Sequence, residues 1–398
     1  METLSFEKAV EEVKDEVVGW RRFLHENPEI SFEERETSAF VYETLESFGG
    51  LELSRPTETS VVASLVGGSP GKTVALRADI DALPITEEND FEFVSKRPGA
   101  MHACGHDGHT AMLLGVAKIM SSMKESISGE VRFIFQHAEE LMPGGAEGMI
   151  ENGVMDGVDS IVGIHLWASL PTGTIGLAYG PMMGSPDIFR ITVNGSGGHA
   201  AMAYKTVDSI AVGAQVVTNL QHVVSRNISP MENAVLSVTS FEGGTTHNVI
   251  PGSVEMEGTV RTLDPEIRKQ MPELMERVIK GVTEAHGATH ELDYSFGYRP
   301  VINDEEVTRV VEETAKNTFG EDAVELQRPT MGGEDFSAYQ QKVPGTFIWV
   351  GAGSEEKDIV HPHHHPRFTF DEDALPIGVR MHLEAAWSLC SGESGAAR

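Results

Sequence analysis

The chain has 398 residues, of which 40% are hydrophobic and 23% are charged, a balance typical of folded globular proteins. Its net charge of −31 argues against affinity for nucleic acids or anionic membranes, and it indicates either a well-solvated surface or adaptation to high salt. The chain has only two cysteines, so we expect no disulfides. We find no signal peptide and no apolar run of about 18 residues, and we therefore predict a soluble cytoplasmic protein without membrane partners or nucleic-acid partners.

Helices alternate with short apolar strands in the first part of the chain. Apolar side chains recur at spacings of three and four from Val10 to Leu24, which predicts an amphipathic helix that ends near Pro28. The patterns that follow predict a helix over residues 34–47, strands over 61–66 and 73–77, a helix over 110–123, and strands over 131–135 and 160–164. This alternation favours an α/β fold in which a mostly parallel sheet has helices on both faces.

Residues 186–296 have a different pattern and are predicted to form an inserted domain. The expected order is strand (188–193), helix (207–224), strand (234–241), strand (254–262), helix (266–285) and strand (291–294). This β-α-β-β-α-β order is that of a ferredoxin-like α+β unit. Because the unit begins and ends with a strand, the chain can return to the point where it left. We therefore predict a first domain of residues 1–185 and 297–398, completed by a helix over 305–318, a strand over 346–350 and a helix over 374–389.

The densest cluster of reactive side chains lies in residues 101–109, Met-His-Ala-Cys-Gly-His-Asp-Gly-His. Thiolate and imidazole groups bind zinc and neighbouring transition metals. Cys104 and His106 are two positions apart, so a turning backbone can direct both at one point. We interpret the cluster as part of a metal site rather than as an ordinary polar loop.

Further candidate ligands follow predicted strands. Asp81, the pair Glu139-Glu140 and His165 each come where an apolar strand is expected to end, a common place for site residues in α/β folds. Adjacent glutamates point in different directions, so one can bind a metal while the other transfers protons. Asp79 and Asp81 could instead be loop caps. At least one of the histidines at 363–365 is expected to be a ligand.

These candidates suffice for two metal ions with open coordination positions, unlike a closed structural zinc site. Two ions can share a water molecule, lower its pKa and polarise a carbonyl oxygen. The glutamate that does not bind metal would take a proton from that water and pass it to a leaving amine. The predicted reaction is therefore hydrolysis of an amide or related C–N bond.

Several motifs occur in the order found in a known family. They are His25-Glu26-Asn27-Pro28-Glu29, Arg77-Ala78-Asp79-Ile80-Asp81-Ala82-Leu83-Pro84-Ile85, Met101-His102-Ala103-Cys104-Gly105-His106-Asp107, Ala138-Glu139-Glu140, Gly163-Ile164-His165, Gly197-Gly198-His199-Ala200-Ala201, His247-Asn248-Val249-Ile250-Pro251, Gly333-Glu334-Asp335-Phe336 and His364-His365-Pro366-Arg367-Phe368. Over about residues 20–380, this set resembles the metal-dependent amidohydrolases that include aminoacylases, hippurate hydrolases, auxin-conjugate (IAA-amino acid) hydrolases and N-acetyldiaminopimelate deacetylases.

The resemblance implies a zinc-exopeptidase-like catalytic domain with two divalent ions per subunit, which could be zinc, manganese, cobalt or nickel. The implied ligands are Cys104, His106, Glu140, His165 and His364. His364 is selected because the family's last ligand is a histidine followed by any residue and then proline. Glu139 would act as general base and then general acid. Asp81 would orient the ring of a ligand histidine.

The resemblance also implies that the inserted domain is a lid that supports homodimerisation and binds substrate. Its substrate-binding residues would be His199, His247 and Asn248, which would polarise the scissile carbonyl or hold a carboxylate. A backbone-bonded loop position is the alternative for His199. His137 departs from the family, in which many members have proline before Ala-Glu-Glu, and we expect it to neighbour the site rather than to bind metal.

We therefore predict a dinuclear metal-dependent amidohydrolase that removes the acyl group from N-acyl amino acids. One alternative is a dipeptidase or carboxypeptidase-type exopeptidase on the same scaffold, and another is a metal-binding protein without turnover. The spare carboxylate of Glu139 argues against the last alternative. We also expect Cys104, once stripped of metal, to be easily oxidised.

Overall fold

The computed structural model describes residues 6–391, which divide into two compact units. Unit 1 comprises the described residues up to 182, with 302–328 and those from 335 onward, and unit 2 comprises 183–301 and 329–334. Unit 2 is thus longer than the predicted 186–296. The backbone explains the difference, since Gly184 donates a hydrogen bond of 2.9 Å to Gly332 and Met183 pairs with Thr330.

Unit 1 contains an eight-stranded mixed sheet in the order β1-β2-β4-β3-β5-β16-β6-β15. Its strands are β1 (Glu52–Ser54), β2 (Val61–Val66), β3 (Ser69–Asp79), β4 (Ser128–Gln136), β5 (Ser160–Pro171), β6 (Ile175–Leu177), β15 (Val324–Leu326) and β16 (Gly345–Gly353). Its helices are α1 (Phe6–Glu26), α2 (Arg35–Phe48), α3 (His106–Ser122), α4 (Ala146–Glu151), α7 (Glu305–Phe319), α8 (Ser337–Gln340) and α9 (Ala374–Ser391). Short helical turns lie at Lys124–Ser126 and Glu321–Ala323. The central strands β4, β3, β5 and β16 are parallel, which confirms the predicted α/β class.

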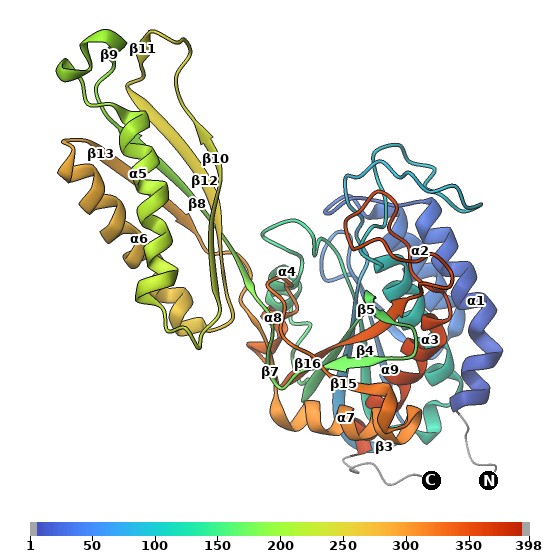
Figure 1. The fold of residues 1–398 in the computed structure, drawn as a ribbon. Helices are drawn as coiled ribbons and strands as arrows, with labels where there is room; N and C mark the ends of the chain where they lie inside the picture. The colour runs from blue at the N-terminus through green and yellow to red at the C-terminus, as the bar shows by residue number, and fades with distance from the viewer. Residues whose placement is uncertain (1–5, 392–398) are drawn as a thin grey trace. The chain divides into compact units, whose positions relative to one another are not determined.

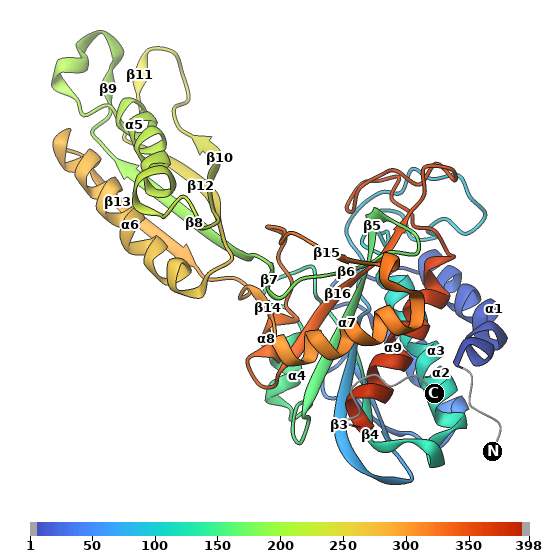
Figure 2. The ribbon, with the colours of Figure 1, turned by 60° about the horizontal axis from the view of Figure 1, so that its bottom comes forward.

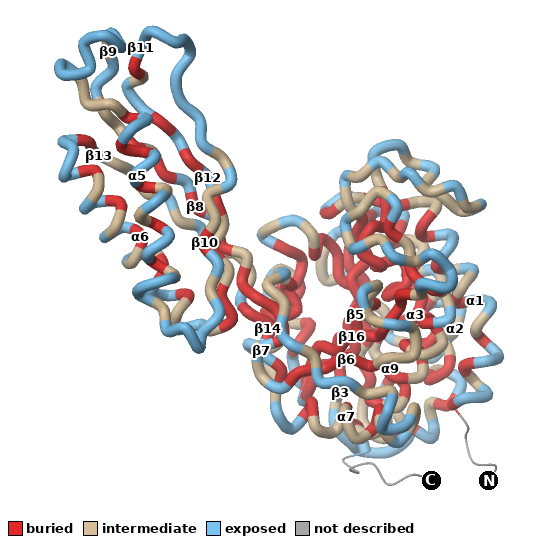
Figure 3. Tube along the Cα trace, in the orientation of Figure 1, coloured by how far each residue is buried: buried red, intermediate tan, exposed pale blue. Residues whose placement is uncertain are grey.

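Side chains of the central strands alternate between two buried faces of the sheet. On one face, Leu76 and Phe133 join the same apolar core as α1, α3 and α9. On the other face, the ring of Phe347 lies 5.0 Å from that of Phe336, just before α8, and Tyr339 of α8 contacts Met149 of α4. Figure 1 shows α4 and α8 on the side of the sheet away from α3 and α9, and Figure 3 shows the strands between them as buried. Helices therefore cover both faces, as predicted.

The strand register aligns the ends at which the candidate ligands lie. Asp79, the last residue of β3, pairs with Gln136, the last residue of β4. Arg77 pairs with Gly163 of β5, so His165 lies level with Asp79. One detail of the prediction is wrong, because β5 does not end at His165 but continues to Pro171, where it still pairs with β16. Figure 2 shows β5 as one long strand. The segments after β3 and β4 and the middle of β5 thus meet at one edge.

Unit 2 is built on a four-stranded antiparallel sheet in the order β10-β12-β8-β13. Along the chain its elements are β8 (Ser185–Asn194), α5 (Ser209–His222), β10 (Ala234–Glu242), β12 (Ser253–Thr262), α6 (Pro265–Ala285) and β13 (Thr289–Ser295). Shorter elements are β9 (Gly198–His199), β11 (Val249–Ile250) and the helical turns Ala200–Lys205 and Val223–Asn227. The paired strands β7 (Gly180–Met183) and β14 (Val301–Asn303) belong mostly to the residues of unit 1. Apolar residues of α5 and α6, such as Leu220 and Met275, pack on the strands in a separate core.

A buried charged cluster connects three elements of unit 2. The Asp187 side chain is fully buried and accepts hydrogen bonds from Arg268 Nε at 3.0 Å and Nη2 at 2.7 Å. It also accepts one of 2.9 Å from the Tyr294 hydroxyl and one of 3.0 Å from the Gly297 backbone. The carboxylate thus joins β8, α6 and the end of β13. Within residues 6–391, no helix has the length and hydropathy needed to cross a lipid bilayer.

Candidate metal centre

The loop before α3 directs two candidate ligands to one point. Met101 and Leu83 exchange two backbone hydrogen bonds of 3.0 Å, which hold the loop on the segment after β3. Gly105 has φ of 93°, in the left-handed region that glycine adopts without strain, and α3 begins at the next residue. This sharp change of direction brings the side chains of Cys104 and His106 to the same side, facing β5 and the ends of β3 and β4.

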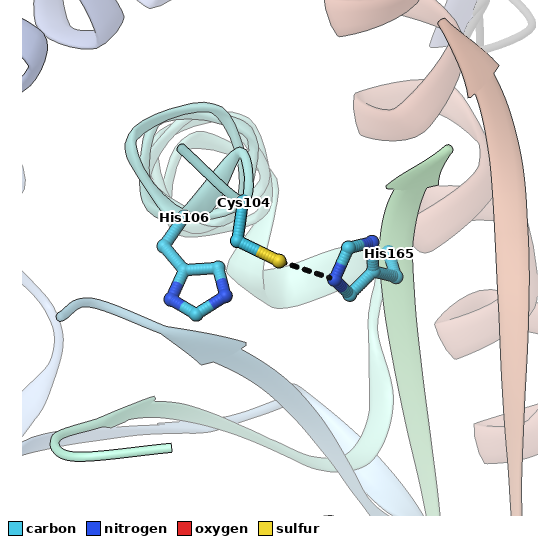
Figure 4. Close-up of side chains that lie close together, drawn as sticks. All are labelled: Cys104, His106 and His165. Carbon is cyan, nitrogen blue, oxygen red and sulfur yellow. Dashed lines mark hydrogen bonds between the residues drawn. The ribbon is translucent and has the colours of Figure 1, made fainter. Parts of the chain in front are cut away.

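A first group of three donors forms around Cys104. Its Sγ atom lies 3.5 Å from Nε2 of His165, and Figure 4 shows the sulfur pointing at this ring with the His106 ring beside it. The donor atoms of Cys104, His106 and His165 lie within 4.8 Å of one another, and all three residues are buried. Thiolate and imidazole at this spacing form a donor set suited to a transition-metal ion.

A second group shares the same thiol. Cys104, Glu140 and His364 also have donor atoms within 4.8 Å of one another, and Nε2 of His364 is 3.1 Å from Oε1 of Glu140. Glu139 lies beside this region, because its carboxylate forms a further such group with His106 and Glu140. The structure therefore brings the five predicted ligands and the predicted base together, with Cys104 between two sets of donors.

The two buried histidines are oriented by hydrogen bonds at Nδ1. His165 Nδ1 is 2.7 Å from the carbonyl oxygen of Leu166, and His106 Nδ1 is 2.9 Å from that of Asp81. Carbonyl oxygens only accept, so both rings carry a proton on Nδ1, and Nε2 is the atom that a metal ion would use. Burial disfavours the charged ring of His106, but the carboxylates of Asp79, Asp81 and Glu140 raise its pKa to about 10, so a cation must displace the proton on Nε2. The Asp81 carboxylate is also 3.3 Å from His106 Nδ1, and it accepts bonds from Ser31 at 2.7 Å and from the Glu140 backbone at 3.0 Å.

Two observations of the site fit bound cations. Among the residues that the structure describes, Nε2 of His106 is buried without a hydrogen bond, and Oε1 of Glu140 makes none either, although Nε2 of His364 lies 3.1 Å away. Buried polar atoms are rarely left unsatisfied, and a metal ion would use these lone pairs. Burial raises the pKa of the Cys104 thiol well above its usual range, and the carboxylates of Glu140 and Glu139 raise this pKa further. A nearby cation would be needed to hold the thiolate.

Sequence reasoning missed the pair Asp79–His109, which supports the segment of His165. His109 Nδ1 is 2.6 Å from the Asp79 carboxylate, and its Nε2 accepts a 2.8 Å hydrogen bond from the Leu166 backbone. Asp79 is held in turn by Arg77 at 2.6 Å. The spacing of three between His106 and His109 was a usable signal, because such residues share a helix face.

Glu34 was also missed, although it holds the turn that leads to Glu139. Its Oε1 atom accepts hydrogen bonds from the backbone of Phe32 at 2.9 Å and of Ala138 at 2.8 Å. Both donors have positive φ, of 68° and 50°. Left-handed backbone is unfavourable for residues with a side chain, so the buried carboxylate stabilises two strained turns.

The histidine run separates into different environments. The His364 side chain is 53% exposed and reaches Glu140, while its backbone donates a 2.8 Å hydrogen bond to Ala103. The His365 ring stacks on that of His361, with centroids 4.4 Å apart, and accepts a hydrogen bond from the Arg367 backbone. His363 is partly buried beside Cys104.

His137 is buried next to Glu139 and Glu140 in sequence but makes different contacts. Its Nδ1 atom is 3.4 Å from the Thr57 hydroxyl, and its ring meets Phe32 edge-on. Among the described residues, the groups of donors close enough to hold a metal do not include it.

The predicted substrate-binding residues lie in unit 2 and are exposed. His199 pairs with Val249 between β9 and β11, and the Ala200 backbone donates a 3.1 Å hydrogen bond to the Asn248 carbonyl, so His199 and Asn248 are close. His199 Nδ1 accepts a 3.1 Å hydrogen bond from the Ala201 backbone, which leaves Nε2 as the donor of a neutral ring. His247 precedes Asn248 in the same exposed loop.

Comparison with known proteins gives consistent matches along the chain. A family model described as Peptidase family M20/M25/M40 matches residues 75–388. An N-acyl-L-amino acid amidohydrolase of Geobacillus stearothermophilus is 63% identical over 299 residues, which cover 75% of this chain and 81% of that protein. Thermostable carboxypeptidase 2 of Saccharolobus solfataricus is 43% identical over 376 residues, which cover 94% of this chain and 95% of that protein.

Among solved structures, a Bacillus subtilis protein described as a dinuclear metal-binding peptidase of the M20 family is similar throughout. It shares 38% sequence identity and superposes with a TM-score of 0.84, and the match covers 96% of this chain and 99% of the other. The similarity in fold therefore extends over both units of the chain.

Proposed function

The chain belongs to the peptidase family M20/M25/M40, and we propose that this hydrolase is a dinuclear metal-dependent amidohydrolase that cleaves the amide bond of N-acylated amino acids. The observation that carries the proposal is the sharing of Cys104 by two groups of metal-binding side chains. A single thiol between two donor sets favours two neighbouring ions over one closed structural site. The similarity to the Geobacillus amidohydrolase supports the choice of substrate class.

The residues proposed to hold the ions are Cys104, His106, Glu140, His165 and His364. When bound, a pair of divalent cations polarises the amide carbonyl and lowers the pKa of a water molecule. A thiolate favours zinc, while the mixture of imidazole and carboxylate also suits manganese, cobalt or nickel. Asp81 keeps the His106 ring in the tautomer that presents Nε2, and the Leu166 carbonyl does the same for His165.

Glu139 is the proposed general base and general acid. It is buried, and its carboxylate lies close to His106 and Glu140 without being needed in either donor group around Cys104. As base it removes a proton from the attacking water, and as acid it delivers that proton to the nitrogen of the leaving amine. The C–N bond breaks as the new C–O bond forms, so one water and one amide give a carboxylic acid and a free amino acid.

Unit 2 is proposed to act as a lid and to support a homodimer. His199, His247 and Asn248 lie in its exposed loops, where His199 Nε2 can donate a hydrogen bond to a carbonyl oxygen or a carboxylate of the substrate. The edge strand β10 carries the exposed apolar side chains Val235 and Phe241. Exposed edge strands readily pair with another chain, which supports association through this unit.

Metal analysis of the purified protein, followed by assays with N-acetyl, N-benzoyl and indole-acetyl amino acids, tests the proposal. We expect about two ions per subunit and release of the free amino acid, lost on chelation and restored by added metal. A protein that binds no metal, or that leaves every N-acyl amino acid intact, would contradict it.

A carboxypeptidase-type activity is the second candidate, favoured by the similarity to thermostable carboxypeptidase 2. Comparison of N-acetyl-leucine with an unblocked dipeptide such as alanyl-leucine distinguishes the two functions. An amidohydrolase for N-acyl amino acids cleaves the first substrate in preference, whereas a peptidase that removes a C-terminal residue from a peptide cleaves the second in preference.

A further inference from the structure

We propose that His363 donates an N–H···S hydrogen bond to the Cys104 thiolate and thereby tunes the ligand that both donor groups share. The inference rests on the proposed metal centre and adds a residue that does not bind metal itself. His363 lies in the run of histidines from which the sequence alone could not assign a role to each member.

The backbone of β5 determines which ring nitrogen of His363 carries the proton. The Ala168 N–H donates a hydrogen bond of 3.3 Å to Nε2 of His363. A backbone N–H can only donate, so Nε2 must offer a lone pair, and the proton of the neutral ring is on Nδ1. Nδ1 lies 3.8 Å from Cys104 Sγ, a separation within the range of hydrogen bonds to the large sulfur atom. The Nδ1–H group therefore faces Cys104, whose backbone also accepts a hydrogen bond from this ring, and the sulfur is the acceptor that binds metal.

Aromatic packing holds the ring in this orientation. The ring centroid of His363 is 4.9 Å from that of Trp167 and 4.8 Å from that of Phe368, with interplanar angles of 38° and 36°. The His165 ring meets it at 71° and 5.3 Å. These neighbours on several sides restrict rotation of the ring. A flip of the ring would also break the hydrogen bond from Ala168.

This geometry separates His363 from the proposed ligands. One of its nitrogens is occupied by a backbone donor and the other is protonated, so neither has a lone pair for a cation. Its effect must pass through the thiolate, whose electron density a hydrogen bond draws away from the metal. Because Cys104 belongs to both donor groups, one hydrogen bond would tune both metal positions.

Two amide substitutions distinguish the donor at Nδ1 from the rest of the ring. In His363→Asn the amide nitrogen can occupy the position of Nδ1 and still donate to the sulfur. In His363→Gln the amide lies one carbon further out, at the position of Nε2, and the donor to sulfur is lost. The two variants are similar in polarity, so a difference between them reports on the position of the N–H group.

The readout is the near-ultraviolet thiolate-to-cobalt charge-transfer band of protein loaded with Co²⁺. Without the hydrogen bond the thiolate is a stronger electron donor, so the band should move to longer wavelength in His363→Gln. The wild type and His363→Asn should share one band position. His363→Phe fills the space of the ring without an N–H and should match His363→Gln, which keeps the test decisive if His363→Gln does not fold.

The possible outcomes separate this inference from the proposed function. A band at the same position in the wild type and in all folded variants would overturn the role of His363 alone. A wild-type protein that binds Co²⁺ without any thiolate band would overturn Cys104 as a ligand, and the inference with it. A shift in His363→Gln or His363→Phe, with His363→Asn unchanged, would support the proposal.

Discussion

The Glu34 carboxylate accepts a hydrogen bond of 2.8 Å from the backbone of Ala138, the residue that precedes Glu139 and Glu140. Burial raises the pKa of Glu34 to about 7, and the nearby charge of Asp81 contributes to this rise. An acid whose pKa is raised by folding stabilises the folded state fully below its unfolded pKa, and this contribution is lost as the pH rises through 7. Ionisation of Glu34 at neutral pH and above therefore destabilises the folded state.

We expect Glu34→Gln to stabilise the metal-free protein at pH 8 but not at pH 5. Gln keeps an oxygen for the two backbone donors and cannot ionise. The substitution should raise the free energy of unfolding by about 2–3 kcal/mol more at pH 8 than at pH 5, at most, given the size of the pKa shift. Urea unfolding at both pH values measures this gain, and Glu46→Gln, at an exposed position of the helix α2 that follows Glu34, is the control. An equal effect of Glu34→Gln at both pH values would show that its ionisation does not limit stability.

Substitution of Glu139 should separate catalysis from metal binding. We expect Glu139→Gln to retain its metal ions and to lose about 10²- to 10⁴-fold in kcat, because the amide can neither take up nor deliver the proton. Glu140→Gln should instead lower the metal content, since this carboxylate belongs to a donor group around Cys104. Metal analysis and initial rates on the same preparations check both expectations. Undiminished turnover in Glu139→Gln would remove Glu139 from the mechanism.

The buried ion pair of unit 2 should contribute much more to stability than an exposed one. Asp187→Ala leaves the buried guanidinium of Arg268 without its carboxylate partner. We expect the free energy of unfolding to fall by about 3–5 kcal/mol. The matched control is Glu257→Ala, which removes an ion pair with Arg190 whose side chains are 59% and 49% exposed. This control should cost less than about 1 kcal/mol. Thermal and urea unfolding compare the two variants, and similar losses would refute the argument.

Parts of the site that depend on strand ends could be predicted from the sequence. Parallel strands place the residues that follow them at one edge of the sheet, so the positions after β3 and β4 indicated Asp81 and the Glu139-Glu140 pair. His165 was also identified, although its strand was predicted too short. The predicted strand ended at His165 because the apolar run of the sequence stops there, whereas the backbone pairing with β16 continues. The strands β6 and β15 were missed, since each has three residues and forms only through tertiary pairing.

Other roles depend on single hydrogen bonds that no sequence pattern reports. His363, His364 and His365 are adjacent and chemically identical, yet one contacts Cys104, one reaches Glu140 and one stacks on His361. Their separation follows from the positive φ of 64° at His364 and from which backbone groups lie nearby. Such features arise only when distant segments meet.

The burial of Cys104 changes the expected redox behaviour of the metal-free protein. The sequence suggested that this cysteine, once stripped of metal, would be easily oxidised. However, the thiol is buried and its pKa is raised well above its usual range by burial and by the carboxylates of Glu140 and Glu139. Peroxide and alkylating agents react with the thiolate, so a neutral buried thiol should resist them.

We therefore expect metal-free protein treated with peroxide at pH 7 to keep Cys104 reduced and to regain activity when metal alone is added. Mass spectrometry of the peptide that contains Cys104 measures the oxidised fraction. The same treatment in urea, where both cysteines are exposed, is the control and should oxidise Cys104 and Cys390 alike. Oxidation of Cys104 as fast in the folded protein as in urea, or recovery that requires a reductant, would mean that metal removal opens the site.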